Sequence, residues 1–359
     1  MEAKEQENSS LRTNNSRNVS EIITRAYVFA PVSNNVKLVI STAMLLFGVY
    51  GLIANSLILY FKHKQHRRRR CAIQRALTRS ALKEYFINSL ALSDLLCCLI
   101  SLPLVTAEMF IDFVHNDWIC KVNRFLNFIF PVITILNLLV IGIERYFAIF
   151  HPFKVLARHK AKKIVMGAWV LGVLLTLIPM PTYKLIYFEI EENSYTLICK
   201  YDNTLPLYRC LFIAFITICY IIPSIILIFV NLRILKFVRR KRCRVAPLQQ
   251  VKTSKRTPSQ TSRFKVTRMF MWLILAFIIP YLLFIVYNGL VMVLRPTISF
   301  TSDYLARYAS AFFGFSNGAV SAAILFHNEK DLKRRLGDML CNNCNQSQIY
   351  PDFPAESNP

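Results

Sequence analysis

Hydrophobic and polar positions alternate along the chain in long blocks rather than residue by residue. Seven apolar stretches run over approximately residues 36–61, 84–110, 120–149, 164–181, 208–238, 266–293 and 304–326. Each has the length of a membrane-spanning helix, and the fourth is the shortest, ending at Pro179 and Pro181. The pattern predicts an all-α membrane protein, a seven-transmembrane helix bundle over residues 36–326. An extracellular tail over 1–35 precedes it, and a short interfacial eighth helix with a cytoplasmic tail over 327–359 follows.

The basic residues lie between the apolar stretches. The net charge is +24, from 44 Lys and Arg against 20 Asp and Glu. Most of the basic residues fall in four blocks, 62–83, 145–163, 233–268 and 330–335. A nucleic-acid-binding domain would carry such charge beside a soluble core, and none is visible, so no nucleic-acid partner is expected. Cytoplasmic loops are rich in Lys and Arg, which predicts an extracellular N-terminus and contact of the run Arg67-Arg68-Arg69-Arg70 with anionic inner-leaflet lipids.

The first 35 residues are polar and lack the apolar core of a signal peptide, so the first span is expected to act as the signal anchor. Three glycosylation sequons begin at Asn8, Asn14 and Asn18. They lie on the side predicted to be extracellular, where glycosylation takes place. A fourth sequon, at Asn345, falls on the inner side and should stay unmodified.

Ten cysteines are present, and their positions suggest different roles. Cys97, Cys98, Cys210 and Cys219 lie in spans and are expected to be buried. Cys120 and Cys199 are the two expected outside the cell, which makes them the natural disulfide pair and would tie the loop 182–207 to the third span. Cys341 and Cys344 follow residues 328–340, where leucines at a spacing of four predict the interfacial helix. These two are candidates for palmitoylation or, equally, free thiols of the tail.

The inner end of the third span carries Glu144-Arg145-Tyr146, a charged pair that is costly inside a membrane and cheap at its edge. Together with seven spans and an outside N-terminus, this motif resembles the rhodopsin-like (class A) G-protein-coupled receptors. The resemblance covers about residues 36–344, with landmarks in the expected order: Gly51, Asn55, Asp94, Cys120, Leu138, Glu144-Arg145-Tyr146, Pro152, Trp169, Pro223 and Pro280.

The resemblance implies two inner sites. Arg145 would contact a heterotrimeric G protein once the sixth span swings outward, Glu144 would neutralise it at rest, and Tyr146 and Pro152 complete the coupling set. Asp94 would hold a sodium ion together with the oxygen donors Thr134, Asn317 and Ser321, a donor set suited to a hard cation. The alternative is a protonated Asp94 hydrogen-bonded to Asn55. The prolines 223 and 280 should kink their spans.

Several family landmarks are absent. Ile278 stands where the family usually has a tryptophan before the sixth-span proline, and Trp272 lies well below it. Ser321-Ala322-Ala323-Ile324-Leu325 replaces the Asn-Pro-x-x-Tyr of the seventh span. Asn231 replaces the inner tyrosine of the fifth span, and Gln260 the acidic residue that often clamps the arginine from the sixth.

The ligand pocket is expected among the outer halves of the third, fifth, sixth and seventh spans. Asn127 occupies the position where amine receptors have aspartate, and Phe315 falls roughly where opsins carry lysine, so both classes are disfavoured. Pro131 should distort the outer half of the third span. The pocket candidates are Asn127, Phe128, Tyr281, Asn288, Arg307 and Tyr308.

The second outer loop alternates as a strand does, before and after Cys199, which predicts a hairpin. Glu189, Glu191 and Glu192 give this hairpin an acidic edge that would suit a basic peptide, although a solvated loop that binds nothing is an equal alternative.

No Gly-rich phosphate loop, H-E-x-x-H helix or nucleophile elbow is present, and no His/Cys cluster suggests a metal site. The prediction is therefore a plasma-membrane receptor, not an enzyme, for a peptide or other non-amine ligand. The alternative is an atypical receptor on the same fold, which scavenges ligand or modulates a partner without ligand-driven G-protein activation.

Overall fold

The structure is a computed structural model that describes residues 26–71, 78–151, 158–191, 194–245, 258–294, 298–328, 332–337 and 339. Several sequence predictions fall outside these residues: glycosylation of Asn8, Asn14 and Asn18, the role of Pro152, and palmitoylation of Cys341 and Cys344. The side chains of Arg67 to Arg70 and of Gln260 are likewise outside the described part.

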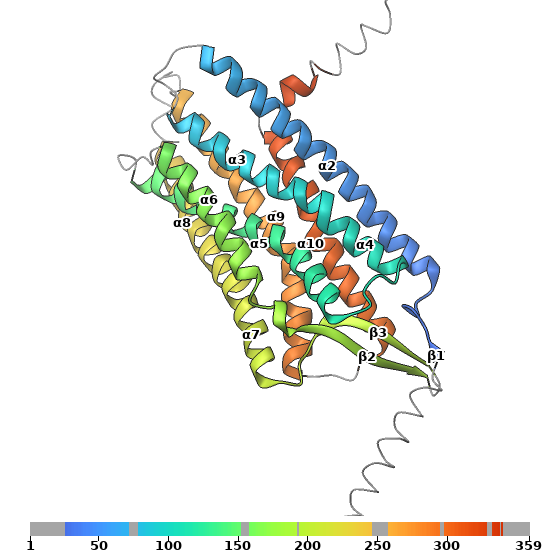
Figure 1. Cartoon of the computed structure of the whole chain (residues 1–359). Coiled ribbons are helices and arrows are strands. Elements are labelled where there is room, and N and C mark those ends of the chain that lie inside the picture. Colours follow the sequence, from blue (N-terminus) through green and yellow to red (C-terminus); the bar gives the residue numbers. More distant parts are fainter. Residues whose placement is uncertain are drawn as a thin grey trace, which may run out of the picture.

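Seven helical segments of the described chain are long and apolar enough to cross a membrane, and they pack side by side (Figure 1). In chain order they are α2 (Asn34–Cys71), α3 (Thr78–Leu96) with its continuation α4 (Leu102–Phe110), α5 (Asp117–Phe150), α6 (Arg158–Thr176), α7 (Pro206–Ile216) with its continuation α8 (Ile222–Val245), α9 (Pro258–Leu294) and α10 (Phe300–Asn328). The predicted all-α seven-helix bundle is confirmed.

Two of the spans contain a single wide π-helical turn that the sequence did not predict. One lies between α3 and α4 at Cys97–Ser101, and the other between α7 and α8 at Thr217–Ile221. Each turn ends two residues before a proline, Pro103 or Pro223. A proline lacks the N–H that an α-helix needs and its ring crowds the preceding carbonyls, and the wider turn relieves both constraints. In contrast, α5 and α9 are continuous through Pro131 and Pro280.

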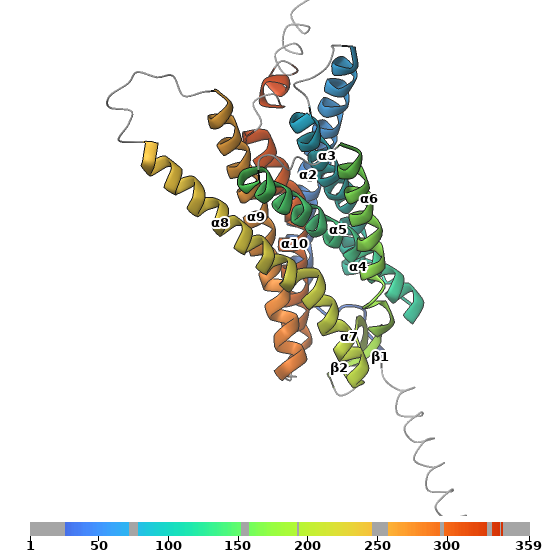
Figure 2. The same cartoon turned by 90° about the vertical axis from the view of Figure 1, so that its left-hand side faces the viewer.

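α5 is the most enclosed span and lies between α3, α6, α8 and α9 (Figure 2). Its contact with α6 depends on Gly172, because a Cβ added there would lie 2.5 Å from Cγ1 of Ile133 and 3.4 Å from its Cα. Gly167, one and a half turns earlier on α6, has nothing within 4 Å. The close approach of the two helices is therefore a local property of Gly172.

A three-stranded sheet covers one end of the bundle, in the order β1-β3-β2 (Figure 1). β2 (Tyr183–Glu191) and β3 (Ser194–Tyr201) form the predicted antiparallel hairpin, longer than the sequence indicated. β1 (Ala26–Tyr27) pairs with β3 in parallel, a strand too short to recognise from sequence. A disulfide joins Cys120 of α5 to Cys199 of β3, as predicted.

An ion pair holds the base of the hairpin, with Lys184 Nζ 2.6 Å from Oδ2 of Asp202. Burial by itself would raise the pKa of the Asp202 carboxyl. The hydrogen bonds from Lys184 and Thr204 outweigh burial, so its pKa lies below the ordinary value. Ionised Asp202 therefore stabilises the folded hairpin.

Two further predictions have different outcomes. Residues 332–337 are helical, Leu332 is buried, and Arg335 Nη1 donates to the carbonyl oxygen of Phe61 at 3.4 Å, consistent with a helix lying at the end of the bundle. The expectation that all four span cysteines are buried is wrong for Cys210, which is exposed on α7, and Cys97 is only half-buried. Apolar stretches do not reveal which face of a helix points outward, and Cys210 lies on an outward face.

Candidate functional site

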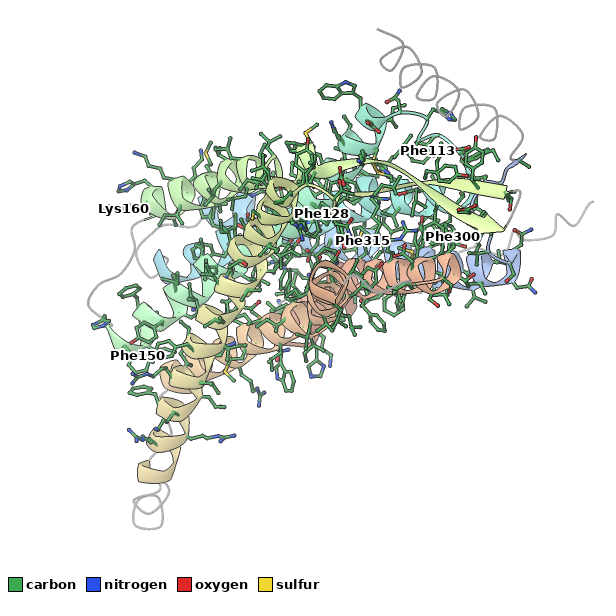
Figure 3. All side chains as sticks on the ribbon, turned by 90° about the horizontal axis from the view of Figure 1, so that it is seen from below. Phe113, Phe128, Phe150, Lys160, Phe300 and Phe315 are labelled. Carbon is green, nitrogen blue, oxygen red and sulfur yellow. A yellow bond between two sulfur atoms is a disulfide. The ribbon has the colours of Figure 1, made fainter. Side chains whose placement is uncertain are left out.

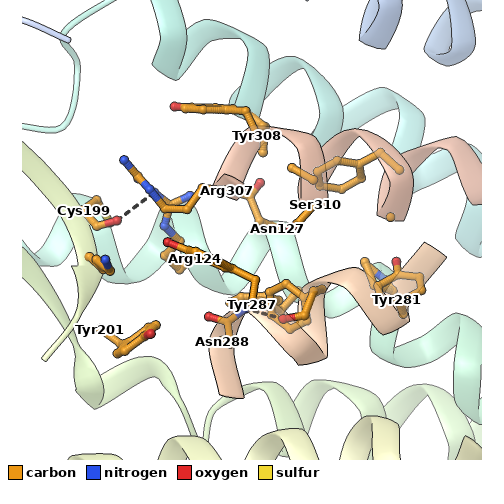
Figure 4. Close-up of a pocket in the computed structure, with 18 of the residues that line it drawn as sticks. Arg124, Asn127, Cys199, Tyr201, Tyr281, Tyr287, Asn288, Arg307, Tyr308 and Ser310 are labelled. Carbon is orange, nitrogen blue, oxygen red and sulfur yellow. Dashed lines mark hydrogen bonds between the residues drawn. The ribbon is translucent and has the colours of Figure 1, made fainter. Parts of the chain in front are cut away.

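A pocket of about 900 Å³, with its open mouth included, lies inside the bundle below the hairpin (Figure 4). Residues of α4, α5, the hairpin, the π-helical turn between α7 and α8, α9 and α10 line it. All six predicted pocket candidates are among the lining residues: Asn127, Phe128, Tyr281, Asn288, Arg307 and Tyr308. The sequence did not single out several others, of which Arg124, Lys200 and Tyr287 bear most on the chemistry.

Five charged residues at the mouth of the pocket form what is called here the outer charge cluster: Glu108 of α4, Arg124 of α5, Lys200 of β3, and Asp303 and Arg307 of α10. Arg124 is paired with Glu108 and also donates to the carbonyl oxygen of Cys199 at 2.9 Å. Figure 4 draws this last bond and shows Arg124 and Arg307 close together.

Asp303 is the carboxylate shared by the other two cations of the cluster, Lys200 and Arg307. Its Oδ1 lies 2.5 Å from Lys200 Nζ, and its Oδ2 lies 2.8 Å from Arg307 Nε. The hydroxyl of Tyr287 donates to the same Oδ1 at 2.5 Å. One carboxylate thus joins the hairpin, α9 and α10. No spacing in the sequence predicts this contact, because Lys200 and Asp303 are 103 residues apart.

Aromatic rings line the deeper part of the pocket. Phe128 contacts the rings of Phe215 and Phe284, with centroids 5.5 Å and 5.9 Å away. Below it, Tyr281 stacks on Tyr220 at 5.4 Å and on Phe277 at 4.4 Å. Phe128 and Phe315 lie in the middle of the bundle in Figure 3, and Phe150 lies at the far end.

The polar core below the pocket is built around Asp94. Its carboxylate accepts hydrogen bonds from Thr134 at 3.2 Å and from Ser321. Asn317 Oδ1 is buried without a hydrogen-bond partner among the described residues. Asn55 Nδ2 donates to the carbonyl oxygens of Gly51 at 2.9 Å and Gly318 at 3.0 Å, so this amide group is used by the backbone rather than by Asp94.

At the inner end of α5, Arg145 and Glu144 form an ion pair, with Nε and Oε2 separated by 2.5 Å. The Arg145 guanidinium also lies over the ring of Phe270 on α9, 5.4 Å from its centroid. Tyr146 stacks on Phe150 at 4.6 Å, and Phe150 in turn contacts Phe237 on α8 at 5.0 Å. The motif therefore contacts α9 directly through Arg145 and reaches α8 through Phe150.

Residues 70–320 match the sequence profile described as 7 transmembrane receptor (rhodopsin family). The chain belongs to this family. Its members are receptors rather than enzymes, and seven spans make this receptor a multi-pass protein of the plasma membrane.

Named relatives agree with this assignment. The receptor is 26% identical over 262 residues to "Probable G-protein coupled receptor 19" of Mus musculus, a match over 68% of this chain and 55% of that protein. It is 31% identical over 181 residues to "Neurotensin receptor type 1" of Mus musculus, over 47% and 39%. It is 29% identical over 187 residues to "D(1)-like dopamine receptor" of Takifugu rubripes, over 49% and 40%. The receptor thus spans about half the length of the relatives it matches.

The departures from the family pattern have visible positions in the receptor. Trp272 is 55% exposed on the outer face of α9, so it does not replace the missing interior tryptophan. Ile278 is half-buried, and the fully buried ring nearest in sequence is Phe277. Phe277, Tyr281 and Tyr220 fill the space between the pocket and the inner half of the bundle.

Proposed function

We propose that this protein is a G-protein-coupled receptor that passes an extracellular, non-amine ligand signal to heterotrimeric G proteins by outward movement of α9. The observation that carries the proposal is that α5 lines the pocket at one end and holds the Glu144–Arg145 pair at the other. Arg124 and Arg145 are 21 residues apart on this helix. At ~1.5 Å of rise per residue that is about 32 Å, roughly the thickness of the hydrocarbon core.

α9 supplies a route between the two ends. Phe270, Phe277, Tyr281 and Phe284 follow one another at spacings of seven, four and three, so they lie on one face of the helix. Phe270 is beneath the Arg145 guanidinium, and Tyr281 and Phe284 line the pocket. A ligand that displaces Tyr281 would therefore act on the element that covers Arg145. This route does not use the missing tryptophan.

The charges of the pocket disfavour an amine. Of the described residues that line it, none is Asp or Glu, and Asn127 stands at the position of the amine-binding aspartate. One relative is named for neurotensin and another for dopamine, an amine, and a lining whose described residues include no Asp or Glu fits the first better than the second. The acidic edge of the hairpin led to the prediction of a basic peptide. Its one described side chain, Glu189, is exposed, and the cations that line the pocket oppose a basic group there.

The polar core supports a second proposal, an allosteric sodium ion at Asp94. Asp94, Thr134, Ser321 and the unpaired Oδ1 of Asn317 are oxygen donors, which hard cations prefer. Bound sodium would neutralise Asp94. Sodium should raise the melting temperature of purified receptor more than potassium does, and Asp94→Asn should remove the difference. Equal effects of the two ions on the unmodified receptor would contradict the proposal.

The test of coupling needs no known ligand. The receptor is expressed with each class of G protein, and basal activity is compared with Arg145→Ala at matched surface display. Arg145→Ala should abolish any activity above background. Arg233→Ala is the control, because Arg233 on the inner part of α8 also lies over an aromatic ring, that of Phe229, at 5.2 Å. No response of any G protein, with surface display confirmed and tissue extracts applied, would favour the atypical receptor that scavenges ligand or modulates a partner.

A further inference from the structure

The outer charge cluster contains more positive than negative charge. Arg124 is balanced by Glu108, whereas Lys200 and Arg307 share the single carboxylate of Asp303. All five side chains are at most 17% exposed, so water solvates them poorly. A buried cation without its own counter-ion is unfavourable. The half of the cluster around Asp303 can therefore accept one more negative charge.

A negatively charged ligand group in the pocket could reach the cations of this cluster. Arg124, Lys200 and Arg307 all line the pocket, whereas Glu108 and Asp303 do not. The three cations come from three different elements, α5, β3 and α10. A ligand entering there meets a lysine and two guanidinium groups, whose N–H groups match the oxygens of a carboxylate.

Deeper in the pocket, an amide group has no partner. Asn127 lines the pocket, is 6% exposed, and neither its Oδ1 nor its Nδ2 has a hydrogen-bond partner among the described residues. It follows Arg124 by three residues, about one turn or ~4.5 Å deeper along α5. A buried amide without a hydrogen-bond partner is unfavourable, and a ligand amide would remove this cost by donating and accepting a hydrogen bond.

The hydroxyl of Tyr201 is also buried in the pocket wall and has no hydrogen-bond partner in the part of the chain that the structure describes. Burial raises its pKa, so it stays protonated and can donate to a ligand oxygen. Between these polar groups, Phe128, Tyr281 and Phe284 form an aromatic surface. The pocket thus presents cations at the mouth, a free amide one turn below and aromatic rings beside it.

We propose that the pocket recognises a ligand ending in a free carboxylate, held by Lys200 and Arg307, with an amide that pairs with Asn127 and an aromatic or apolar body on Phe128 and Tyr281. The proposal deepens the proposed function by naming the ligand class, and it rests on the same pocket. The ligand carboxylate competes with Asp303 for the two cations. Binding therefore loosens the contact of Asp303 with the hairpin while Tyr287 still holds it.

The experiment measures thermal stabilisation of the purified full-length receptor in lipid nanodiscs, with no G protein present. The probes are tripeptides ending in Phe, Tyr, Trp or Leu, each made with a free C-terminal carboxylate and with a C-terminal amide. A second arm compares aromatic monocarboxylic acids of the phenylpropanoic type with their primary amides. This arm distinguishes a peptide terminus from a small organic acid as the source of the carboxylate.

At least one acid should stabilise the receptor at a concentration tenfold or more below that of its amide. Arg307→Gln and Lys200→Gln should reduce this preference to less than threefold. Lys184→Gln is the control, since Lys184 lies on the same hairpin but pairs with Asp202 outside the pocket, and it should keep the full preference. The comparison of acid and amide on the unmodified receptor remains decisive if a variant fails to fold.

Equal responses to acids and amides, a preference for amides, or no response to any acid up to its solubility limit would overturn the proposal. The outcome is separate from that of the proposed function. Stabilisation by acids without G-protein activation would contradict coupling alone. Basal coupling that depends on Arg145, without a preference for acids, would contradict the carboxylate proposal alone.

Discussion

Asp303→Asn tests whether the outer charge cluster stabilises the receptor. The substitution keeps the shape of the side chain and removes the charge that Lys200, Arg307 and Tyr287 share. Asp303 is 1% exposed, whereas Lys200 and Arg307 side chains are 16% and 17% exposed. Breaking a buried ion pair from one side costs about 3–5 kcal/mol. Because the two cations retain some contact with water, the expected loss is nearer ~2–4 kcal/mol.

The free energy of unfolding is compared in nanodiscs with a thiol-reactive dye, which reports exposure of the buried thiols Cys98 and Cys219. Asp112→Asn is the matched control, since its side chain is 32% exposed and a surface carboxylate is worth about 0–1 kcal/mol. Combining Asp303→Asn with Lys200→Gln should cost less than the sum of the two single changes, by ~0.5–3 kcal/mol. Additive effects, or a single change within ~0.5 kcal/mol of the unmodified receptor, would refute the reasoning.

Three further predictions concern the α5–α6 contact, the disulfide and the base of the hairpin. Gly172→Ala should destabilise the receptor by ~1–3 kcal/mol, because a Cβ there enters the α5–α6 contact, whereas Gly167→Ala should be neutral or stabilising; equal melting temperatures would contradict this. Cys120→Ser or Cys199→Ser removes a link across 79 residues, worth about 4.5 kcal/mol of chain entropy, so surface display measured by flow cytometry should fall. Since its pKa is held below the ordinary value, Asp202 contributes stability that is fully present above pH ~4 and is lost as the pH falls through its folded pKa. Asp202→Asn should therefore flatten the pH dependence of the melting temperature below pH ~4.

Much of the fold could be predicted from the sequence because it depends on features that lie along the chain, such as the length of apolar stretches and the positions of cysteines. Seven apolar stretches predict seven spans, and the structure bounds them within a few residues of the prediction. Cys120 and Cys199 were paired because they alone were expected outside the cell, and the structure joins them. The sequence places the pocket among the outer halves of the third, fifth, sixth and seventh spans, and all six pocket candidates line the pocket.

What the sequence could not supply depends on contacts between distant residues. Lys200 follows a disulfide cysteine and Asp303 lies near the start of a helix. Nothing in the sequence indicates that these two residues form an ion pair, yet they do. Pro223 predicted a kink but not the π-helical turn before it. The unpaired amide of Asn127 is equally invisible, because any buried asparagine looks the same in sequence.

In the proposed mechanism, the connections of α9 would carry an input to Arg145, although the receptor lacks the family's usual interior tryptophan. The disulfide holds the hairpin to α5, so Lys200, next to Cys199, is fixed relative to that helix. Asp303 bridges Lys200 to Tyr287 at the outer end of α9, and Phe270 lies under Arg145 at its inner end. Tyr287 and Phe270 are 17 residues apart, about 26 Å along one continuous helix. A carboxylate that draws Lys200 and Arg307 away from Asp303 therefore frees the outer end of α9 from α5. The same helix covers the arginine that the proposed G protein must reach.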